Sequence, residues 1–178
     1  MFKKLAATAL GGCLLVAALC LGLLPVTALA AGDDAPATLY VGETQITGSG
    51  YWTTDTNGKL AAADANNYNV YYDGNGTLTL KDATIQGRGE ISQGDPIDYG
   101  IYAASTGGQS VSLTINLIGS NTVKGYSGIY VGASGGDSTL VIQSDTNGSL
   151  ETSGNGWNGI GLLSDSGNVF LTINNASV

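Results

Sequence analysis

The residues that most enzymes use for nucleophilic chemistry are scarce in this chain. Histidine is absent, and both cysteines, Cys13 and Cys20, lie within the first thirty residues. Ser-His-Asp and Cys-His nucleophilic systems and histidine-ligated zinc are therefore excluded. Carboxylates, amides and aromatic rings are the groups that remain available for chemistry.

One carboxylate pair has a spacing that suggests glycoside cleavage. Hydrolysis needs two carboxyl groups about 5 to 9 Å apart across the scissile bond, and Asp95 and Asp98 stand close together in GDPIDYG. Pro96 between them indicates a turn, so solvated loop charges are the favoured interpretation. A polysaccharide lyase would combine carboxylates with a basic residue, and Arg88 is the only arginine. The enzymatic alternative stays open, and we assign no catalytic residue.

Three acidic loops are candidates for calcium. They are Asp55-Thr56-Asn57-Gly58, Asp73-Gly74-Asn75-Gly76 and Asp145-Thr146-Asn147-Gly148, with Asp73, Asn75, Asp145 and Asn147 as the candidate ligands. Asp and Asn oxygens on a tight turn suit a hard cation. The same residues also form Asx turns without a metal. Ca²⁺ is the one cofactor that the sequence leaves open.

Aromatic side chains form the most promising set. Aligning Gly100-Ile101-Tyr102 with Gly128-Ile129-Tyr130 places Tyr102 above Tyr130, about 4.8 Å apart if the segments are adjacent strands. The same alignment brings Tyr126 beside Trp157. Such a platform can stack on sugar faces while polar neighbours bind hydroxyls. The predicted polar partners are Tyr99, Asp98 and Asn158. The alternative is that the rings stack only on one another.

These residues lie in a chain that repeats itself. Leu78-Thr79-Leu80, Leu113-Thr114-Ile115, Leu140-Val141-Ile142 and Leu171-Thr172-Ile173 recur at spacings of 35, 27 and 31 residues. The Gly-Ile segments recur in phase with them, ending at Gly159-Ile160-Gly161. Repeats of this length are typical of stacked coils, in which each unit buries its apolar face against a copy.

The pattern inside each repeat predicts three short strands. Leu and Ile alternate with Thr in the Leu-x-Ile segments, so the apolar residues should point inward. A third strand is expected at Ala83-Thr84-Ile85, Asn121-Thr122-Val123 and Ser149-Leu150-Glu151. We therefore predict an all-β fold, a right-handed, single-stranded parallel β-helix of about three to four coils. An antiparallel sandwich is the alternative.

An amide ladder is expected along one edge of these strands. Asn116, Gln143 and Asn174 follow successive Leu-x-Ile segments, and such amides can bond to one another. Lys81 holds this position in the first repeat. We interpret the ladder as structural.

The chain divides into three regions. Residues 1–30 combine Lys3 and Lys4 with an apolar run and Ala28-Leu29-Ala30, which predicts a cleaved secretory signal peptide. Residues 31–68 are expected to be a linker and capping strands, with the aromatics of Tyr51-Trp52 as core plugs. Residues 69–178 hold the repeats, and the lack of a polar cap after Val178 predicts a truncated array with an incomplete C-terminal end.

The net charge predicted for the mature chain limits the classes of partner that it can bind. The full sequence carries a net charge of −8, and removing Lys3 and Lys4 makes it −10. An acidic surface argues against nucleic acid and against anionic membranes as partners.

Several segments resemble a known family. LYVGETQIT, YYDGNGTLTLKDATIQG, GIYA and LTINLIGSNTVKG are similar to the repeats of secreted bacterial β-helix proteins of the carbohydrate-binding-domain type. The resemblance covers most of residues 39–178. It implies a non-catalytic surface protein that binds acidic or plant-type polysaccharide, in some members with Ca²⁺.

Together these observations predict a secreted, non-catalytic protein at a bacterial surface. Its expected partner is an extracellular polysaccharide or a host glycan, with no nucleic acid and no membrane in the mature form. The first alternative is a structural stalk or adhesin segment with no ligand of its own. The second alternative is a polysaccharide lyase or hydrolase.

Overall fold

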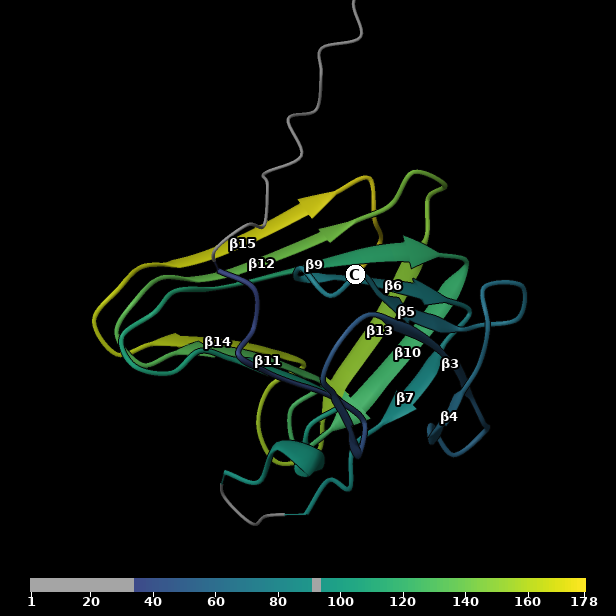
Figure 1. Cartoon of the computed structure of the whole chain (residues 1–178), viewed down its shortest axis with the longest axis horizontal. Coiled ribbons are helices and arrows are strands. Elements are labelled where there is room, and N and C mark those ends of the chain that lie inside the picture. Colours follow the sequence, from purple (N-terminus) through teal and green to yellow (C-terminus); the bar gives the residue numbers. More distant parts are fainter. Residues whose placement is uncertain (1–33, 91–93) are drawn as a thin grey trace, which may run out of the picture. The chain divides into compact units, whose positions relative to one another are not determined.

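The computed structural model describes residues 34–90 and 94–178, and nearly all regular structure in them is β (Figure 1). The predicted signal peptide, residues 1–30, lies outside the described residues. The strands are β1 (Thr38–Val41), β2 (Thr44–Ile46), β3 (Gly50–Thr54), β4 (Leu60–Ala62), β5 (Val70–Tyr72), β6 (Thr77–Lys81), β7 (Thr84–Gln86), β8 (Ile101–Ala104), β9 (Val111–Ile118), β10 (Ser120–Gly125), β11 (Ile129–Ala133), β12 (Ser138–Gln143), β13 (Ser149–Gly154), β14 (Ile160–Ser164) and β15 (Val169–Asn174), with one 3-10 turn, η1 (Pro96–Asp98). No helix in these residues is long and apolar enough to cross a membrane.

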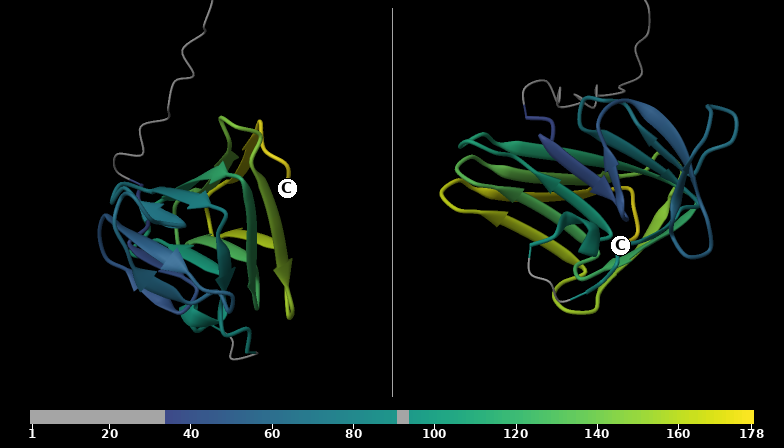
Figure 2. Two further views of the ribbon diagram at one scale, coloured as in Figure 1. Left: turned by 90° about the vertical axis from the view of Figure 1, so that its right-hand side faces the viewer. Right: turned by 60° about the horizontal axis from the view of Figure 1, so that its bottom comes forward.

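The strands from β6 onward visit three sheets in a fixed rotation. β6, β9, β12 and β15 lie in a seven-stranded sheet, β7, β10 and β13 form a three-stranded sheet, and β8, β11 and β14 lie in a five-stranded sheet. Strands one rotation apart pair in parallel in all three sheets and lie side by side (Figure 2). The all-β prediction with parallel strands is confirmed, and an antiparallel sandwich is wrong for this part of the chain.

Apolar side chains at every second position of the strands point inward and fill the space between the sheets. The inward positions of the repeats are fully or almost fully buried, including Leu78, Leu80, Leu113, Ile115, Leu140, Ile142, Ile101 and Ile129. Outward threonines alternate with them, as Thr77 and Thr79 do with the buried Leu78 and Leu80 in β6. Each buried Leu or Ile side chain contributes about 1.5–3 kcal/mol relative to exposure, so this core is the main source of stability.

The register of the first repeat differs from the sequence alignment. Leu78 pairs with Ile115, and Leu80 pairs with Leu117, whereas the alignment matched Leu78 with Leu113. A shift by two residues keeps every side chain on its own face, so alternation alone cannot detect it. The third strand of the next repeats is also shifted, because Asn121 pairs with Leu150 rather than with Ser149.

The N-terminal strands extend the sheets in the opposite direction. β1 pairs antiparallel with β8, and β5 pairs antiparallel with β6. This antiparallel pairing includes β5, which begins at Val70, beyond the predicted boundary at residue 68. Of the predicted core plugs, Trp52 packs against the core, whereas Tyr51 lies on the other side of β3 and contacts Tyr68 and Tyr71.

At β15 the predicted inward residues are not buried. Leu171 and Ile173 continue the columns of Leu140 and Ile142, yet they are 48% and 45% exposed. They pair on one side only, with β12, and the described residues place no strand on the other side. Their register agrees with the prediction, and their burial does not.

Amide side chains tie neighbouring repeats together. Asn116, Gln143 and Asn174 are aligned as predicted, and Gln143 Nε2 donates to Asn116 Oδ1 over 2.7 Å. Thr79, rather than Lys81, holds the equivalent position in β6. A second amide, Asn121, is 2% exposed. Its Oδ1 accepts from the Ala83 N–H at 2.9 Å, and its Nδ2 donates to the Ser149 carbonyl at 3.2 Å.

We predict that Asn121→Ala destabilises the fold. Asn121 joins three successive repeats, and its loss leaves the buried Ala83 N–H without its acceptor, which costs about 1–3 kcal/mol per unsatisfied buried group. The expected result is a Tm lower by several degrees and a lower midpoint of urea unfolding, measured by circular dichroism.

Ser127→Ala is the matched control. Ser127 is fully buried, and its hydroxyl has no hydrogen-bond partner within the described residues. Removing a polar group that makes no bond should leave the Tm unchanged or raise it. An unchanged Tm for Asn121→Ala would contradict the structural role of this amide.

Candidate functional site

The aromatic residues gather where the chain passes from the three-stranded sheet to the five-stranded sheet. The described parts of three successive connections stack here, residues 87–90 and 94–100 in the first, 126–128 in the second and 155–159 in the third. Main-chain bonds continue the sheet ladder through them, from Gly100 N to Ser127 O (3.1 Å) and from Gly128 N to Asn158 O (3.1 Å). We call this stack the ring corner.

Glycine allows the connections to approach this closely. A Cβ on Gly100 would lie 2.5 Å from the Gly128 carbonyl oxygen, and a Cβ on Gly125 would lie 2.8 Å from that of Asp98. Both distances are far below van der Waals contact, so the glycines of the repeated Gly-Ile segments are steric requirements of the stacking.

Five rings meet at the ring corner. Tyr102 and Tyr130 stack with centroids 5.2 Å apart and planes 14° from parallel, as the alignment predicts. Tyr99 packs against both and lies edge-on to Tyr126 at 6.0 Å. The fifth ring, Trp157, lies 6.1 Å from Tyr130.

Trp157 takes the place that a third tyrosine would occupy. Tyr130 pairs with Gly161 on β14, and a Cβ on Gly161 would lie 3.7 Å from the Trp157 ring. The indole therefore covers the position above Gly161 and continues the row of rings. Its backbone N–H donates to the Tyr126 carbonyl at 2.9 Å, which holds it beside Tyr126.

Part of this ring set is open to solvent. Trp157 is 49% exposed, whereas Tyr99 is 7% exposed. Tyr102, Tyr126 and Tyr130 are partly buried. Tyr99, Tyr126 and Trp157 line an open pocket of about 220 Å³. The predicted platform thus consists of one buried ring, Tyr99, three partly buried rings and the exposed indole of Trp157, with Tyr126 and Trp157 at the pocket.

Burial also changes the acidity of the supporting tyrosines. Desolvation raises the pKa of Tyr99, Tyr102 and Tyr130 above the ordinary value of 10.0. After burial, the neighbouring phenols and the nearby carboxylates raise the pKa of Tyr99 and Tyr130 further, with Asp98 beside Tyr99 and Asp165 beside Tyr130. These phenols are neutral hydrogen-bonding groups at any physiological pH.

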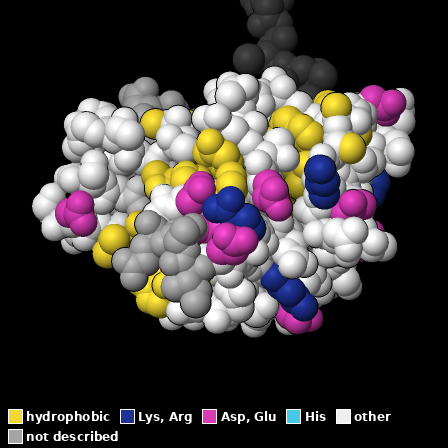
Figure 3. Space-filling model, turned by 90° about the horizontal axis from the view of Figure 1, so that it is seen from below, with side chains coloured by type: hydrophobic (Ala, Val, Ile, Leu, Met, Phe, Trp, Pro, Cys, Tyr) yellow, Lys and Arg dark blue, Asp and Glu magenta, His cyan; other side chains and the backbone are white. Residues whose placement is uncertain are grey.

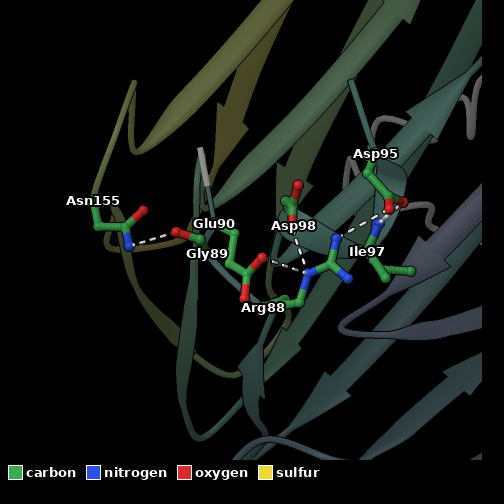
Figure 4. Close-up of polar contacts among 7 residues, drawn as sticks. All are labelled: Arg88, Gly89, Glu90, Asp95, Ile97, Asp98 and Asn155. Atoms are coloured by element: carbon green, nitrogen blue, oxygen red, sulfur yellow. Dashed lines mark hydrogen bonds and ion pairs between the residues drawn. The ribbon is translucent and has the colours of Figure 1, made fainter. Parts of the chain in front are cut away.

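Arg88 binds two aspartates within the connection between β7 and β8, the longest of the three (Figure 4). Its Nε donates to Asp98 Oδ1 at 2.9 Å, its Nη2 donates to Asp95 Oδ2 at 3.0 Å, and Glu90 lies 3.6 Å from Nε. The hydrogen bond to Asp98 raises the pKa of Arg88 above its usual value. The guanidinium therefore stays charged and anchors η1 beside the rings.

This arrangement changes the role expected for Asp98. The sequence suggested a solvated loop charge or a polar partner for a ligand, but Asp98 is 1% exposed. Its carboxylate bonds to Arg88, and its main-chain oxygen accepts from Tyr126 N at 2.8 Å. Burial forces a carboxylate to pair with a cation, and sequence spacing could not show which of the four Lys and Arg residues after residue 30 would do so.

A polar groove adjoins the rings. It is lined by Gln86, Arg88, Lys124, Ser153 and Asn155 together with four glycines, and it measures about 220 Å³. Asn155 Nδ2 donates to the Gly89 carbonyl at 2.9 Å and closes one side (Figure 4). Asn158, a predicted polar partner, is exposed next to Trp157. Sequence reasoning missed Ser153, near the end of β13, and Asn155, although their place in a glycine-rich segment shortly before Trp157 was a usable signal.

Acidic and basic side chains lie close together on one face of the structure, next to hydrophobic side chains (Figure 3). Lys124 lies 3.7 Å from Glu151, and Arg88 contacts three carboxylates. The two cations in the groove are therefore matched or outnumbered by nearby acids, so the groove has no surplus of positive charge for an anion.

The loops predicted to bind calcium make hydrogen bonds of their own. Asp73 Oδ1 accepts from Asn75 N and Thr77 N, and Asp55 Oδ1 accepts from Asn57 N and Lys59 N. These are the Asx turns that the same residues predict. In the third loop, which contains Asp145 and Asn147, Ser144 Oγ accepts from Thr146 N and Gly148 N. No cluster of three or more acidic side chains able to hold a metal occurs in residues 34–90 and 94–178.

Comparison with protein-family models, with curated proteins and with solved structures finds no match for this chain. The resemblance seen in the sequence repeats therefore remains an expectation. The functional argument must come from the geometry of the ring corner itself.

We predict that the tyrosine cluster makes the fold sensitive to alkali. A phenol whose pKa is raised by folding contributes stability that is fully present below its unfolded pKa, near 10, and is lost as pH rises through the higher folded pKa. Ultraviolet difference absorbance should show a group of tyrosines that ionise above pH 10, together with a loss of stability over the same range.

The matched variant is Tyr99→Phe/Tyr102→Phe/Tyr130→Phe. It keeps the rings and removes the ionisable hydroxyls, so its urea midpoint should fall less between pH 9 and pH 12 than that of the wild type. The same alkaline loss in both proteins would show that these burial effects are not linked to folding.

Proposed function

We propose that this chain is a secreted, non-catalytic bacterial surface protein that binds a glycan at the ring corner. In this proposal residues 1–30 are a cleaved signal peptide, and the strands from β6 to β15 wind as a right-handed parallel β-helix. The fixed rotation of strands through three sheets supports this winding. The ligand is an extracellular polysaccharide or a host glycan.

The observation that carries the proposal is the open pocket formed by Tyr99, Tyr126 and Trp157. An exposed indole on a rigid support offers an apolar face of the kind on which the C–H face of a sugar ring stacks. Trp157 is 49% exposed although the sheet beneath it is well packed. Tyr126 stands beside it, and Asn158 supplies an amide for sugar hydroxyls.

The charge around the site favours a neutral glycan over an acidic one. Arg88 is already bonded to Asp98 and Asp95 and lies near Glu90. A uronic acid would have to compete with three carboxylates inside one protein and would approach a mature chain of net charge −10. Hydroxyl-rich neutral chains meet no such barrier.

A second candidate function, cleavage of a polysaccharide, is favoured by one observation. The polar groove contains Arg88 with two carboxylates within hydrogen-bonding distance, as a lyase or hydrolase would require. The carboxylates, however, bond to Arg88 itself, and Asp98 is 1% exposed. A general acid or base needs access to the substrate, so we rank this function below binding.

The decisive experiment measures glycan binding by Trp157→Ala and by Tyr126→Ala/Trp157→Ala. Loss of one exposed aromatic contact should weaken binding at the ring corner about tenfold, and loss of both should abolish binding at that site. Binding is measured on a glycan array and by intrinsic fluorescence, with and without a chelator, which also tests the calcium hypothesis.

Trp157→Phe and Leu163→Ala are the controls for this experiment. Trp157→Phe keeps a ring and should retain part of the affinity. Leu163 is also exposed on β14, at 44%, so its replacement tests for a general effect of removing apolar surface. Unchanged binding by the folded double variant would remove the platform and favour the structural stalk. Release of unsaturated or reducing sugar by the wild type would favour the enzyme.

A further inference from the structure

A second row of aromatic and amide side chains crosses the outer face of the seven-stranded sheet. The pairing registers join Tyr51 to Tyr71, Tyr71 to Thr79, Thr79 to Asn116, Asn116 to Gln143 and Gln143 to Asn174. We call these six residues the amide row. Adjacent strands are about 4.8 Å apart, so the row extends over roughly 24 Å.

All six side chains point away from the core. Tyr71 lies between the buried residues Val70 and Tyr72, and Asn116 lies between the buried Ile115 and Leu117. Alternation therefore sends the members of the row to the outer face. Each is partly buried or exposed, so the row is accessible while its backbone is held by the sheet.

One end of the row is an aromatic surface. Tyr51 and Tyr71 stack at 4.5 Å with planes 22° apart, and Tyr68 lies edge-on to Tyr51 at 5.2 Å. Lys81 Nζ lies 5.4 Å from the centre of the Tyr68 ring, which steadies that ring by a cation–π contact. The next residue beyond Tyr51 is Ala63, whose N–H donates to the Tyr51 carbonyl and whose methyl is too small to cover the phenol.

The other end of the row is made of amides. Gln143 Nε2 donates to Asn116 Oδ1, and this bond orients both groups. Asn116 then retains its NH₂ donors, and Gln143 retains its carbonyl acceptor. The row itself contains a hydroxyl, three amides and two phenols, and no charged group.

We infer that the amide row is a second glycan-binding surface, for an extended neutral polysaccharide chain. Rings at one end can stack on a sugar face, while the hydroxyl and amides that follow at regular intervals can bond to successive sugar hydroxyls. Absence of charge in the row and the acidity of the whole chain both favour a neutral polymer. This surface shares no residue with the ring corner, so it goes beyond the proposed function and can be tested separately.

The test uses neutral hexasaccharides of β-1,4-linked glucose, xylose and mannose, with binding followed by calorimetry. In the Tyr126→Ala/Trp157→Ala background the ring corner should no longer bind, and binding to at least one probe should persist. Tyr71→Ala in that background should weaken this binding about tenfold, and Tyr71→Phe should retain it.

A second variant tests the amide row in case Tyr71→Ala does not fold. Asn116→Asp keeps the oxygen that accepts from Gln143 Nε2 but removes the NH₂ donors, so the sheet is preserved and binding should weaken severalfold. Thr139→Ala is the matched control, because Thr139 lies on the same face of β12, four residues and roughly 13 Å from Gln143. It should bind like its parent.

The outcomes separate the two surfaces. Loss of all binding in the folded Tyr126→Ala/Trp157→Ala variant would overturn the amide row and leave the ring corner standing. Unchanged affinity in folded Tyr71→Ala and Asn116→Asp variants would also overturn it. If Trp157→Ala has no effect in the wild-type background while Tyr71→Ala does, the amide row stands and the ring corner fails.

Discussion

Parallel, in-register stacking of equivalent strands is the constraint on which this structure depends. Because each strand bonds to its counterpart one repeat away, identical positions lie about 4.8 Å apart in columns. One column of inward residues contains Leu113 and Leu140, and an outward column contains Tyr102 and Tyr130. A slip by one residue would turn every side chain to the opposite face. Core, aromatic stack and amide ladder therefore depend on the same main-chain bonds.

The corners allow departures from this regularity, and the candidate site lies at one of them. Strands must match their neighbours closely, whereas a connection can lengthen if its ends still meet the ladder. The connection between β7 and β8 is the longest of the three. The Arg88–Asp98 ion pair joins the two ends of this connection. Glycines such as Gly100 and Gly125 bring the connections close enough for their rings to meet.

The two proposed surfaces use the same physical scheme on different sheets. In each, aromatic rings are supported by a rigid sheet and followed by uncharged polar groups. Arg88 and Lys124 are instead paired with nearby carboxylates. In both proposals, uncharged polar groups at strand spacing face the hydroxyls of a linear polymer.

Several features could be predicted from the sequence because they depend on local periodicity. Alternating Leu and Thr predicted the strands, and the repeat in phase predicted the pairs Tyr102–Tyr130 and Asn116–Gln143. These inferences need only the rule that equivalent positions stack.

Other features were decided only by the tertiary structure. The two-residue shift of β6, the burial of Asp98 against Arg88 and the exposure of Trp157 depend on contacts between segments far apart in the chain. Tyr51 and Tyr71 are aligned with Asn116 because β3 pairs antiparallel with β5, β5 pairs antiparallel with β6, and β6 pairs with β9. The sequence repeats do not predict this antiparallel pairing. Alternation determines which face a side chain occupies, but it carries no information on register in steps of two or on the partner of a buried charge. Those depend on how the sheets and corners pack.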